Sequence, residues 1–271
     1  MLARYPFILT SWGGEVLALA GTEMLGKRLA TFAAKRARAI IVDARILRDI
    51  WIKLGVDKSK IHVIPFGVDT TTFNRQANSD AVKNDLHLDK DDVVTISTRF
   101  LFNHHYNIDC LIKAIPLIRK EHEKARFLIK GSGPLEGYLK RLTERLGVSD
   151  SVRFVGLVPH DKVAQYLSAA DIYVSTCYVD STSVSLLEAM ACGLAPVVTD
   201  IAGNREWIED GVNGLLFPPR NSEVLAEKIN QLIENQQLRK SYGKKCAQII
   251  TEKATWDKCV SSMEAVYEAL L

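Results

Sequence analysis

Short runs rich in β-branched residues alternate with longer helical patterns along almost the whole chain. The runs expected to form strands are residues 7–11, 40–43, 61–65, 93–98, 127–130, 152–155, 172–175, 196–199 and 214–217. Helical patterns, such as those at 109–121, 135–146 and 161–169, lie between these runs. Such alternation predicts parallel sheets covered by helices on both faces. The fold class is therefore α/β, built on a doubly wound parallel sheet.

A turn-rich stretch at residues 65–69 (PFGVD) divides the chain unequally. The expected strands after it suffice for one complete doubly wound sheet. Only about three precede it, fewer than the roughly five or six strands of an average sheet. We therefore expect part of a domain over residues 1–66 and a complete domain over 67–255. Residues 256–271 are expected to form a C-terminal helix that packs back towards the N-terminal part.

Charge and cysteine usage exclude several classes of protein. The 35 Lys and Arg residues against 32 Asp and Glu leave a formal charge of +3, too mild to indicate a nucleic-acid partner. The five cysteines are scattered and form no C-x-x-C pair, which favours free thiols in a reducing compartment. No apolar run is long enough to span a bilayer, and the N-terminal one is shorter than a signal-peptide core. The expected location is cytoplasmic.

Polar loops follow several of the predicted strands. Ligands of open parallel sheets bind beyond the carboxyl ends of the strands, so these loops are the candidate binding region. Arg99 follows the strand at 93–98, and Gly131 and Gly133 follow the strand at 127–130. The spacing of these glycines does not match a dinucleotide-binding fingerprint. A tight strand-to-helix turn with Pro134 as the first helical residue is favoured, and a close backbone approach to a ligand remains compatible with it.

The segment DSTS, residues 180–183, precedes a predicted helix and is more specific. Thr182 or Ser183 can cap that helix, whose first amide groups and positive dipole end suit a diphosphate. Glu188 lies one helical turn after Val184, at the edge of the expected apolar stripe. A carboxylate there indicates hydroxyl or cationic partners. The alternative is an ordinary helix cap followed by a surface glutamate.

These motifs carry a family resemblance. The chain reads DSTSVSLLEAMACGLAPVV, then AGNREWIEDG and VNGLLFPP, over residues 170–218. This run resembles the C-terminal donor domain of retaining glycosyltransferases of group 1 (family 4), whose pattern is E-G-x-x-x-x-x-x-E-A-M-A-x-G-x-P-V-V. The match extends to Arg99, to GSGP and to VIPFGVDTTTF, so it covers nearly the whole chain. It implies the Rossmann-like donor domain of a GT-B fold plus a partial N-terminal Rossmann-like domain.

The resemblance also implies a reaction and its residues. Such enzymes move a hexosyl-type sugar from a nucleotide-diphosphate sugar, here a UDP- or GDP-sugar, to a glycan or lipid-linked acceptor with retention, as in polysaccharide biosynthesis. The implied catalytic residues are Arg99, which neutralises the diphosphate, and Asp180, which contacts hydroxyls of the transferred sugar. Glu188 would accept hydrogen bonds from the ribose. The family looks metal-independent, so neither a metal nor another cofactor is expected.

The remaining implied contacts are made by backbone. Amide groups at Thr182, Ser183 and Val184 would hold the diphosphate, and Gly131 and Gly133 would let the chain pass close to the nucleotide.

The chain departs from the family pattern in three ways. Asp180 replaces the usual glutamate, and Ser181 replaces a glycine. Tyr106 and the asparagine after it stand where the family has Lys-Gly, so a neutral donor replaces a cation. His104 or His105 could compensate, although paired histidines in a loop more often face solvent.

The N-terminal part resembles only the end of the family's acceptor domain. Its first strands, its glycine-rich loop and the histidine near the reacting centre are missing. The residues Trp12, Gly13, Gly14 and Glu15 resemble a remnant of the acceptor cleft, although a core aromatic is the favoured interpretation of Trp12. The alternatives to an active transferase are a truncated, non-catalytic homologue that binds a nucleotide-sugar and, third, a nucleotide-sugar epimerase with the same fold. The inner face of a membrane is a further candidate partner.

Overall fold

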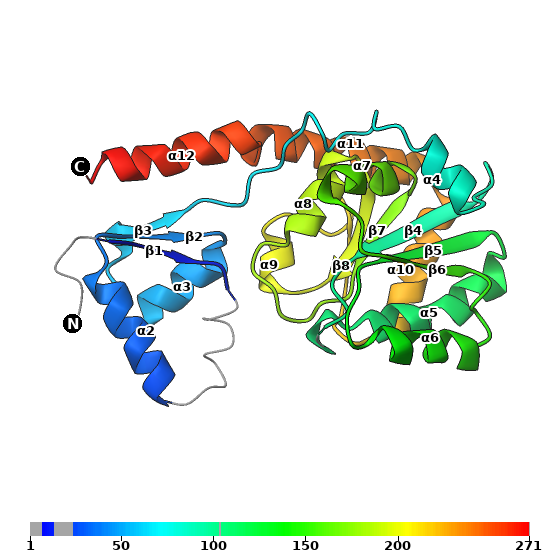
Figure 1. Cartoon of the computed structure of the whole chain (residues 1–271), viewed down its shortest axis with the longest axis horizontal. Coiled ribbons are helices and arrows are strands. Elements are labelled where there is room, and N and C mark those ends of the chain that lie inside the picture. The colour runs from blue at the N-terminus through cyan, green and yellow to red at the C-terminus, as the bar shows by residue number, and fades with distance from the viewer. Residues whose placement is uncertain (1–6, 14–23, 103, 271) are drawn as a thin grey trace.

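The computed structural model describes residues 7–13, 24–102 and 104–270. In these residues the strands form two parallel sheets, one with three strands in the order β1-β2-β3 and one with six in the order β6-β5-β4-β7-β8-β9 (Figure 1). Every pairing between the strands within each sheet is parallel. The predicted α/β fold class, with a doubly wound sheet and a smaller Rossmann-like part before it, is confirmed.

In its described residues, the N-terminal lobe contains the small sheet and two helices. Its elements are β1 (Ile8–Ser11), α2 (Met24–Arg36), β2 (Ala39–Val42), α3 (Arg45–Lys53) and β3 (Ile61–Val63), with a 3-10 turn at Lys58–Lys60. All four residues of β2 are buried, as expected for a central parallel strand covered on both faces. Alternate residues of β2 enter different cores: Ile40 and Val42 pack with Trp51 of α3, whereas Ile41 faces the opposite side.

The large sheet forms the second lobe. Its strands are β4 (Val93–Thr98), β5 (Ala125–Lys130), β6 (Val152–Gly156), β7 (Ile172–Ser175), β8 (Ala195–Thr199) and β9 (Leu215–Phe217). The helices of this lobe are α4 (Asp80–Asp85), α5 (Ile108–Glu121), α6 (Glu136–Arg145), α7 (His160–Ser168), α8 (Val184–Ala191), α9 (Ala202–Arg205), α10 (Ser222–Glu234) and α11 (Gln236–Lys253). A 3-10 turn at His104–Tyr106 precedes α5.

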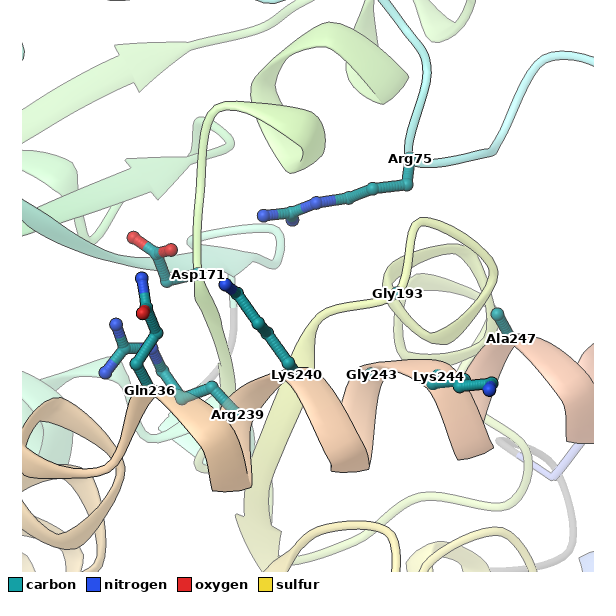
Figure 2. Close-up of a pocket in the computed structure, with 9 residues that line it drawn as sticks. All are labelled: Arg75, Asp171, Gly193, Gln236, Arg239, Lys240, Gly243, Lys244 and Ala247. Carbon is teal, nitrogen blue, oxygen red and sulfur yellow. The ribbon is translucent and has the colours of Figure 1, made fainter. Parts of the chain in front are cut away.

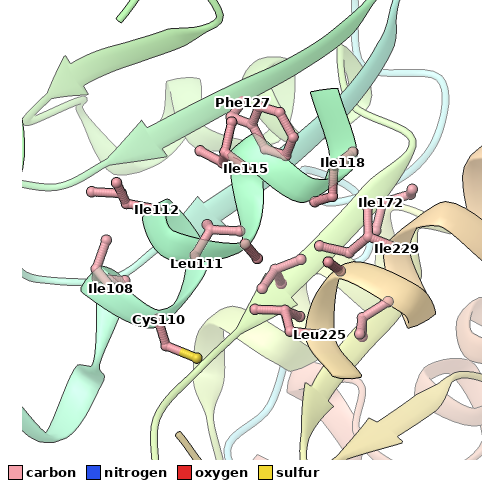
Figure 3. Close-up of a cluster of buried hydrophobic side chains, with 14 of the residues drawn as sticks. Ile108, Cys110, Leu111, Ile112, Ile115, Ile118, Phe127, Ile172, Leu225 and Ile229 are labelled. Atoms are coloured by element: carbon pink, nitrogen blue, oxygen red, sulfur yellow. The ribbon is translucent and has the colours of Figure 1, made fainter. Parts of the chain in front are cut away.

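Two separate cores cover the faces of the large sheet. Helices α5, α6 and α10 pack on one face, where Phe127 and Ile172 meet Ile115 of α5 and Ile229 of α10 (Figure 3). Helices α7, α8 and α11 pack on the other face, around Tyr173. Successive residues of a strand point to opposite faces of the sheet. Because helices cover both faces, the strand side chains that point to either face are apolar.

The turn after β5 differs from the prediction. Helix α6 begins at Glu136, so Pro134 lies in the preceding turn, and the expectation that it is the first helical residue is wrong. Gly131 and Gly133, in the same turn, have φ angles of 139° and 159°.

Two chain segments connect the lobes, and they run side by side. The amide of Val68 donates to the carbonyl of Ala254 at 2.8 Å, and the amide of Trp256 donates to the carbonyl of Val68 at 2.9 Å. A Cβ on Gly67 would lie 2.7 Å from the Cα of Trp256, so only glycine allows this approach. From there α12 (Trp256–Glu268) returns to the N-terminal lobe, where Cys259 packs against the face of β2 not covered by α3 (Figure 1).

A direct contact between the lobes involves the first turn of α3. The amides of Arg45 and Ile46 donate to the two carboxylate oxygens of Glu206, at 2.9 and 3.0 Å. A carboxylate at a helix N-terminus satisfies amides that the helix leaves unpaired and complements its dipole. The lobe containing Glu206 is thereby fixed against the smaller lobe.

All five cysteines are unpaired and buried. Among the described residues, no helix combines the length and the apolar character that crossing a bilayer requires.

Candidate functional site

Arg99 and Asp180 meet at the carboxyl edge of the large sheet. Arg99 follows β4, and Asp180 lies in the loop after β7, the neighbour of β4 in the sheet. The Nη2 atom of Arg99 donates to Asp180 Oδ2 at 2.7 Å and to Ser175 Oγ at 3.2 Å. The chain order of the strands reverses between β4 and β7, which makes this position the switch point where open α/β sheets bind ligands.

The guanidinium of Arg99 is held in a largely buried position. Burial by itself lowers the pKa of Arg99, but Tyr173, Asp180 and Cys177 outweigh it and raise this pKa above its ordinary value. The Nε atom is buried and has no hydrogen-bond partner among the described residues. Arg99 therefore places a permanent positive charge, with a donor to spare, beside the switch point.

Tyr106 lies against this cation. The Cζ atom of Arg99 is 5.6 Å from the centroid of the Tyr106 ring, and Thr176 Oγ1 donates to the Tyr106 carbonyl at 2.8 Å. Neighbouring His105 also lies near Asp180 and Arg99, but burial lowers the pKa of His105 below its ordinary value. This direction favours the neutral imidazole of His105.

The DSTS loop is tied to the N-terminal lobe. Asp43, which directly follows β2, accepts hydrogen bonds from Ser181 Oγ at 2.8 Å and from the Thr182 amide at 3.3 Å. The Thr182 hydroxyl donates to the Asp43 carbonyl at 2.7 Å. Burial raises the pKa of Asp43 to about 6, and the hydrogen bonds from Ser181 and Thr182 partly offset that rise. Sequence reasoning missed Asp43, because its partners lie in the other lobe.

Helix α8 begins directly after this loop. Ser183 is its N-cap, and the Ser183 hydroxyl accepts a hydrogen bond from the Leu186 amide at 3.2 Å. Val184 is the first helical residue, and its side chain is partly exposed. Ser183 and Val184 thus stand at the positive end of the helix dipole, beside Asp180.

Glu188 is buried, with 7% of its surface exposed, so it is not a surface glutamate. Its Oε1 atom lies 2.8 Å from His160 Nε2 at the start of α7. Burial raises the pKa of Glu188, while His160 and Lys130 act to lower it. Burial also lowers the pKa of Lys130, the last residue of β5. The carboxylate therefore has two basic neighbours, neither of which was singled out from the sequence.

Glu188 borders a cavity of about 440 Å³ between α8 and the segments that join the lobes, which contribute residues 66–69 and Trp256. Apolar and aromatic side chains make up most of its wall, among them Phe66, Phe73, Val184 and Trp256. Such a lining, together with the carboxylates of Glu188 and Asp69, suits a ligand that has a flat ring and hydroxyl groups.

Gly131 and Gly133 pack against the backbone of the Arg99 loop. A Cβ on Gly131 would lie 2.1 Å from the carbonyl oxygen of Arg99, and one on Gly133 would lie 2.4 Å from the carbonyl carbon of Leu101. The close approach that the structure shows is thus between two protein loops. These glycines allow Arg99 to occupy its position, and their predicted contact with a nucleotide stays a prediction.

Trp12 is 61% exposed, so the expectation of a core aromatic is wrong. Its ring lies 5.4 Å from that of Phe66, and its carbonyl accepts a hydrogen bond from Ser181 Oγ. Gly13 is described, whereas Gly14 and Glu15 lie outside the described residues.

One group in the described chain has the spacing of metal ligands. It comprises Glu121, His122 and Glu234, at the ends of α5 and α10. These residues lie near the amino ends of the strands, away from Arg99 and Asp180, and exposed acidic groups of this kind are common without an ion.

Comparisons with known proteins identify the family. The model of glycosyl transferases group 1 matches residues 78–248. The uncharacterized glycosyltransferase MJ1069 of Methanocaldococcus jannaschii is 33% identical over 60% of this chain and 42% of its own length. One subunit of the phosphatidylinositol N-acetylglucosaminyltransferase of Arabidopsis thaliana is 24% identical over 98% of this chain and 57% of its own length. The chain spans about half the length of these curated relatives.

Solved structures show the same architecture. A crystal structure of Anabaena Alr3699/HepE in complex with UDP and glucose superposes with a TM-score of 0.85, at 23% identity, over 98% of this chain and 72% of that one. Sucrose-phosphate synthase from Thermosynechococcus elongatus also gives a TM-score of 0.85, at 21% identity, over 99% of this chain and 69% of that one. The protein belongs to the glycosyl transferases of group 1 and has the GT-B architecture.

Proposed function

We propose that this chain binds a nucleotide-diphosphate sugar at the switch point between β4 and β7. We propose further that it belongs to an enzyme that transfers the sugar, with retention, to a glycan or lipid-linked acceptor. The observation that carries the proposal is the ion pair between Arg99 and Asp180 beside the N-terminus of α8. It combines a fixed cation, a helix dipole and a carboxylate, the groups that a diphosphate and a sugar require.

The geometry suggests which part of the ligand each of these groups would bind. A diphosphate would compete with Asp180 for Arg99. Once the diphosphate has taken the place of Asp180 at Arg99, the Asp180 carboxylate would be available to the hydroxyls of the sugar. Arg99 would then stabilise the negative charge that develops on the leaving diphosphate. Because the Thr182 amide donates to Asp43, the amides of Ser183 and Val184 would carry the backbone part of diphosphate recognition.

The nucleoside would occupy the cavity beside Glu188. Its apolar wall suits a base, and the buried carboxylate can accept hydrogen bonds from two ribose hydroxyls. The complex of the Anabaena protein with UDP and glucose supports a uridine nucleotide, and the name of the Arabidopsis relative supports a lipid-linked acceptor. Peripheral attachment to the inner face of a membrane belongs to the same proposal.

Titration calorimetry tests the donor site without requiring an acceptor. We expect binding of UDP-glucose, UDP-N-acetylglucosamine or GDP-mannose. The substitutions Arg99→Ala and Glu188→Ala should each weaken it by about 1–3 kcal/mol, the loss expected for a hydrogen bond to a charged group. Arg145→Ala and Glu223→Ala, which change exposed residues of α6 and α10, are the matched controls. Unchanged affinity in both site variants would overturn the site assignment.

Sugar transfer is tested separately, by adding a lipid-linked or glycan acceptor and determining the anomeric configuration of the product. Binding without turnover would favour the non-catalytic homologue, and a change of the sugar's configuration without transfer would favour an epimerase. Transfer that inverts the anomeric centre would contradict retention.

A further inference from the structure

A second concave site lies at the opposite edge of the large sheet. Its cavity of about 390 Å³ is bordered by Asp171, which precedes β7, and by Gly193, which precedes β8 (Figure 2). The amino ends of these strands therefore face it, whereas Arg99 and Asp180 follow the carboxyl ends of their strands. The first half of α11 forms one wall.

Positive charge dominates the lining. Arg75, Arg239, Lys240 and Lys244 contribute four cations, and Asp171 is the one acidic residue among the lining residues. The Oδ2 atom of Asp171 already accepts a hydrogen bond from the Val94 amide at 3.0 Å. Throughout residues 7–13, 24–102 and 104–270, no carboxylate forms an ion pair with any of the four cations. Such an excess of charge in a concave surface attracts anions.

Two of the cations are anchored by backbone carbonyl groups. Arg75 Nη1 donates to the Ala170 carbonyl at 2.9 Å. Arg239 is 9% exposed, and its Nη1 atom donates to the carbonyls of Leu232 and Ile233 at the end of α10. A guanidinium has five N–H donors, so each arginine keeps donors for a ligand. In Figure 2, Arg75 and Lys240 extend from two walls towards Asp171, whereas Lys244 is directed along α11.

Helix α11, which carries three of the four cations, packs closely against the sheet. A Cβ on Gly243 of α11 would lie 2.0 Å from the carbonyl oxygen of Gly193, so the helix rests directly on the turn before β8. Gln236, the first residue of α11, also lines the cavity and adds the positive end of an 18-residue helix dipole. The backbone of α11, which carries three of the four cations, is thus fixed by packing before an anion binds.

We propose that this cavity binds a small anion that carries two or more phosphate groups, and that it is separate from the nucleotide-sugar site. The volume lies within the usual range for small-molecule sites and exceeds the needs of one phosphate. Arginine and lysine on two walls can contact different phosphate groups of one ligand, the arginines through paired donors and Lys240 as a point charge. Asp171 would accept a hydrogen bond from a hydroxyl group or from a protonated phosphate oxygen of the ligand.

Calorimetric titration with inorganic pyrophosphate tests the site in the whole 271-residue chain. The experiment uses an Arg99→Ala background, because pyrophosphate is also a fragment of the proposed donor and would bind at Arg99. In that background Lys240→Gln should weaken binding about ten-fold or more, the effect of losing a charge-assisted hydrogen bond. Lys240→Arg should retain most of the affinity. Lys253→Gln, at the exposed end of the same helix, is the matched control and should change nothing.

Three outcomes would overturn the inference. The first is the absence of pyrophosphate binding in the Arg99→Ala protein. The second is an equal loss of pyrophosphate affinity in Lys240→Gln and Lys253→Gln, which would show that the anion is attracted to surface charge in general. The third is binding of orthophosphate as tight as that of pyrophosphate, which would exclude a requirement for two phosphate groups. None of these results depends on whether the chain binds a nucleotide-sugar.

Discussion

At the scale of single residues, the site depends on carboxylates whose partners come from distant parts of the chain. Glu188 contacts His160, and Asp180 contacts Arg99. Arg99 and Asp180 could be selected from the sequence, because each stands in a loop after an apolar strand. His160 could not, because nothing in its neighbourhood indicates that α7 brings it to Glu188. Lys130 carried a usable signal: a charged residue that ends an apolar strand directly before the glycine loop.

His160 tunes the charge of Glu188, and this effect can be measured. Its hydrogen bond lowers the pKa of Glu188, so His160→Ala should raise that pKa. If nucleotide binding requires the ionised carboxylate, the variant will lose affinity at a higher pH than the wild type as the solution is acidified. Calorimetry with UDP between pH 5 and 8 measures this shift, with His122→Ala as a remote control. If the wild type and His160→Ala lose affinity for UDP at the same pH, the coupling between His160 and Glu188 is contradicted.

At the scale of elements, the hydrophobic pattern predicts most of the large sheet. The predicted ranges 93–98 and 172–175 agree with the bounds of β4 and β7, because both strands are short apolar runs bounded by polar residues. The pattern contains no information on which strands are neighbours. The pairing of Thr95 with Ile172 creates the switch point, and it arises only from packing of the whole sheet.

The turn after β5 offers a test of how elements position the site. Gly131→Ala would place a Cβ against the Arg99 carbonyl, so we expect reduced stability together with weaker nucleotide-sugar binding. Gly147→Ala is the matched control, because Gly147 also has a positive φ, 66°, but has open space around its Cβ position. That control should lose about 1–2 kcal/mol of stability through backbone strain alone. Denaturation and calorimetry measure the two effects, and normal binding by Gly131→Ala would contradict a positioning role.

At the scale of the whole molecule, the junction of the two lobes contains a titratable group. Asp43 reaches from the N-terminal lobe to the DSTS loop, and Glu206 reaches in the opposite direction to the first turn of α3. Both junctions depend on residues far apart in sequence, which is why neither was predicted. Trp12 was misjudged for the same reason: its ring contacts Phe66, and its carbonyl accepts a hydrogen bond from Ser181 of the large lobe.

The raised pKa of Asp43 predicts a pH-dependent stability. Its ordinary value is 3.8 and burial raises it to about 6, so folding favours the protonated carboxyl group. The stabilising contribution is fully present below pH 3.8 and is lost as the pH rises through about 6. Asp43→Asn should therefore remove this dependence and raise the free energy of unfolding at pH 7 by on the order of 2–3 kcal/mol.

Urea denaturation between pH 4 and 7.5 measures the difference between this variant and the wild type. Asp49→Asn, which changes an exposed residue of α3, serves as the control and should follow the wild-type profile. The prediction fails if Asp43→Asn shows the same pH dependence as the wild type.

The return of α12 to the small sheet has a consequence for synthesis of the protein. One contact of this region, between Arg38 and the carbonyl of Leu270, joins residues 232 positions apart. At roughly 5–20 residues per second, a ribosome needs on the order of 10–50 s to produce the intervening chain. During that interval the face of β2 that Cys259 covers in the finished molecule lacks its helix. In a nascent chain this apolar face of β2 therefore stays uncovered until α12 has been synthesised.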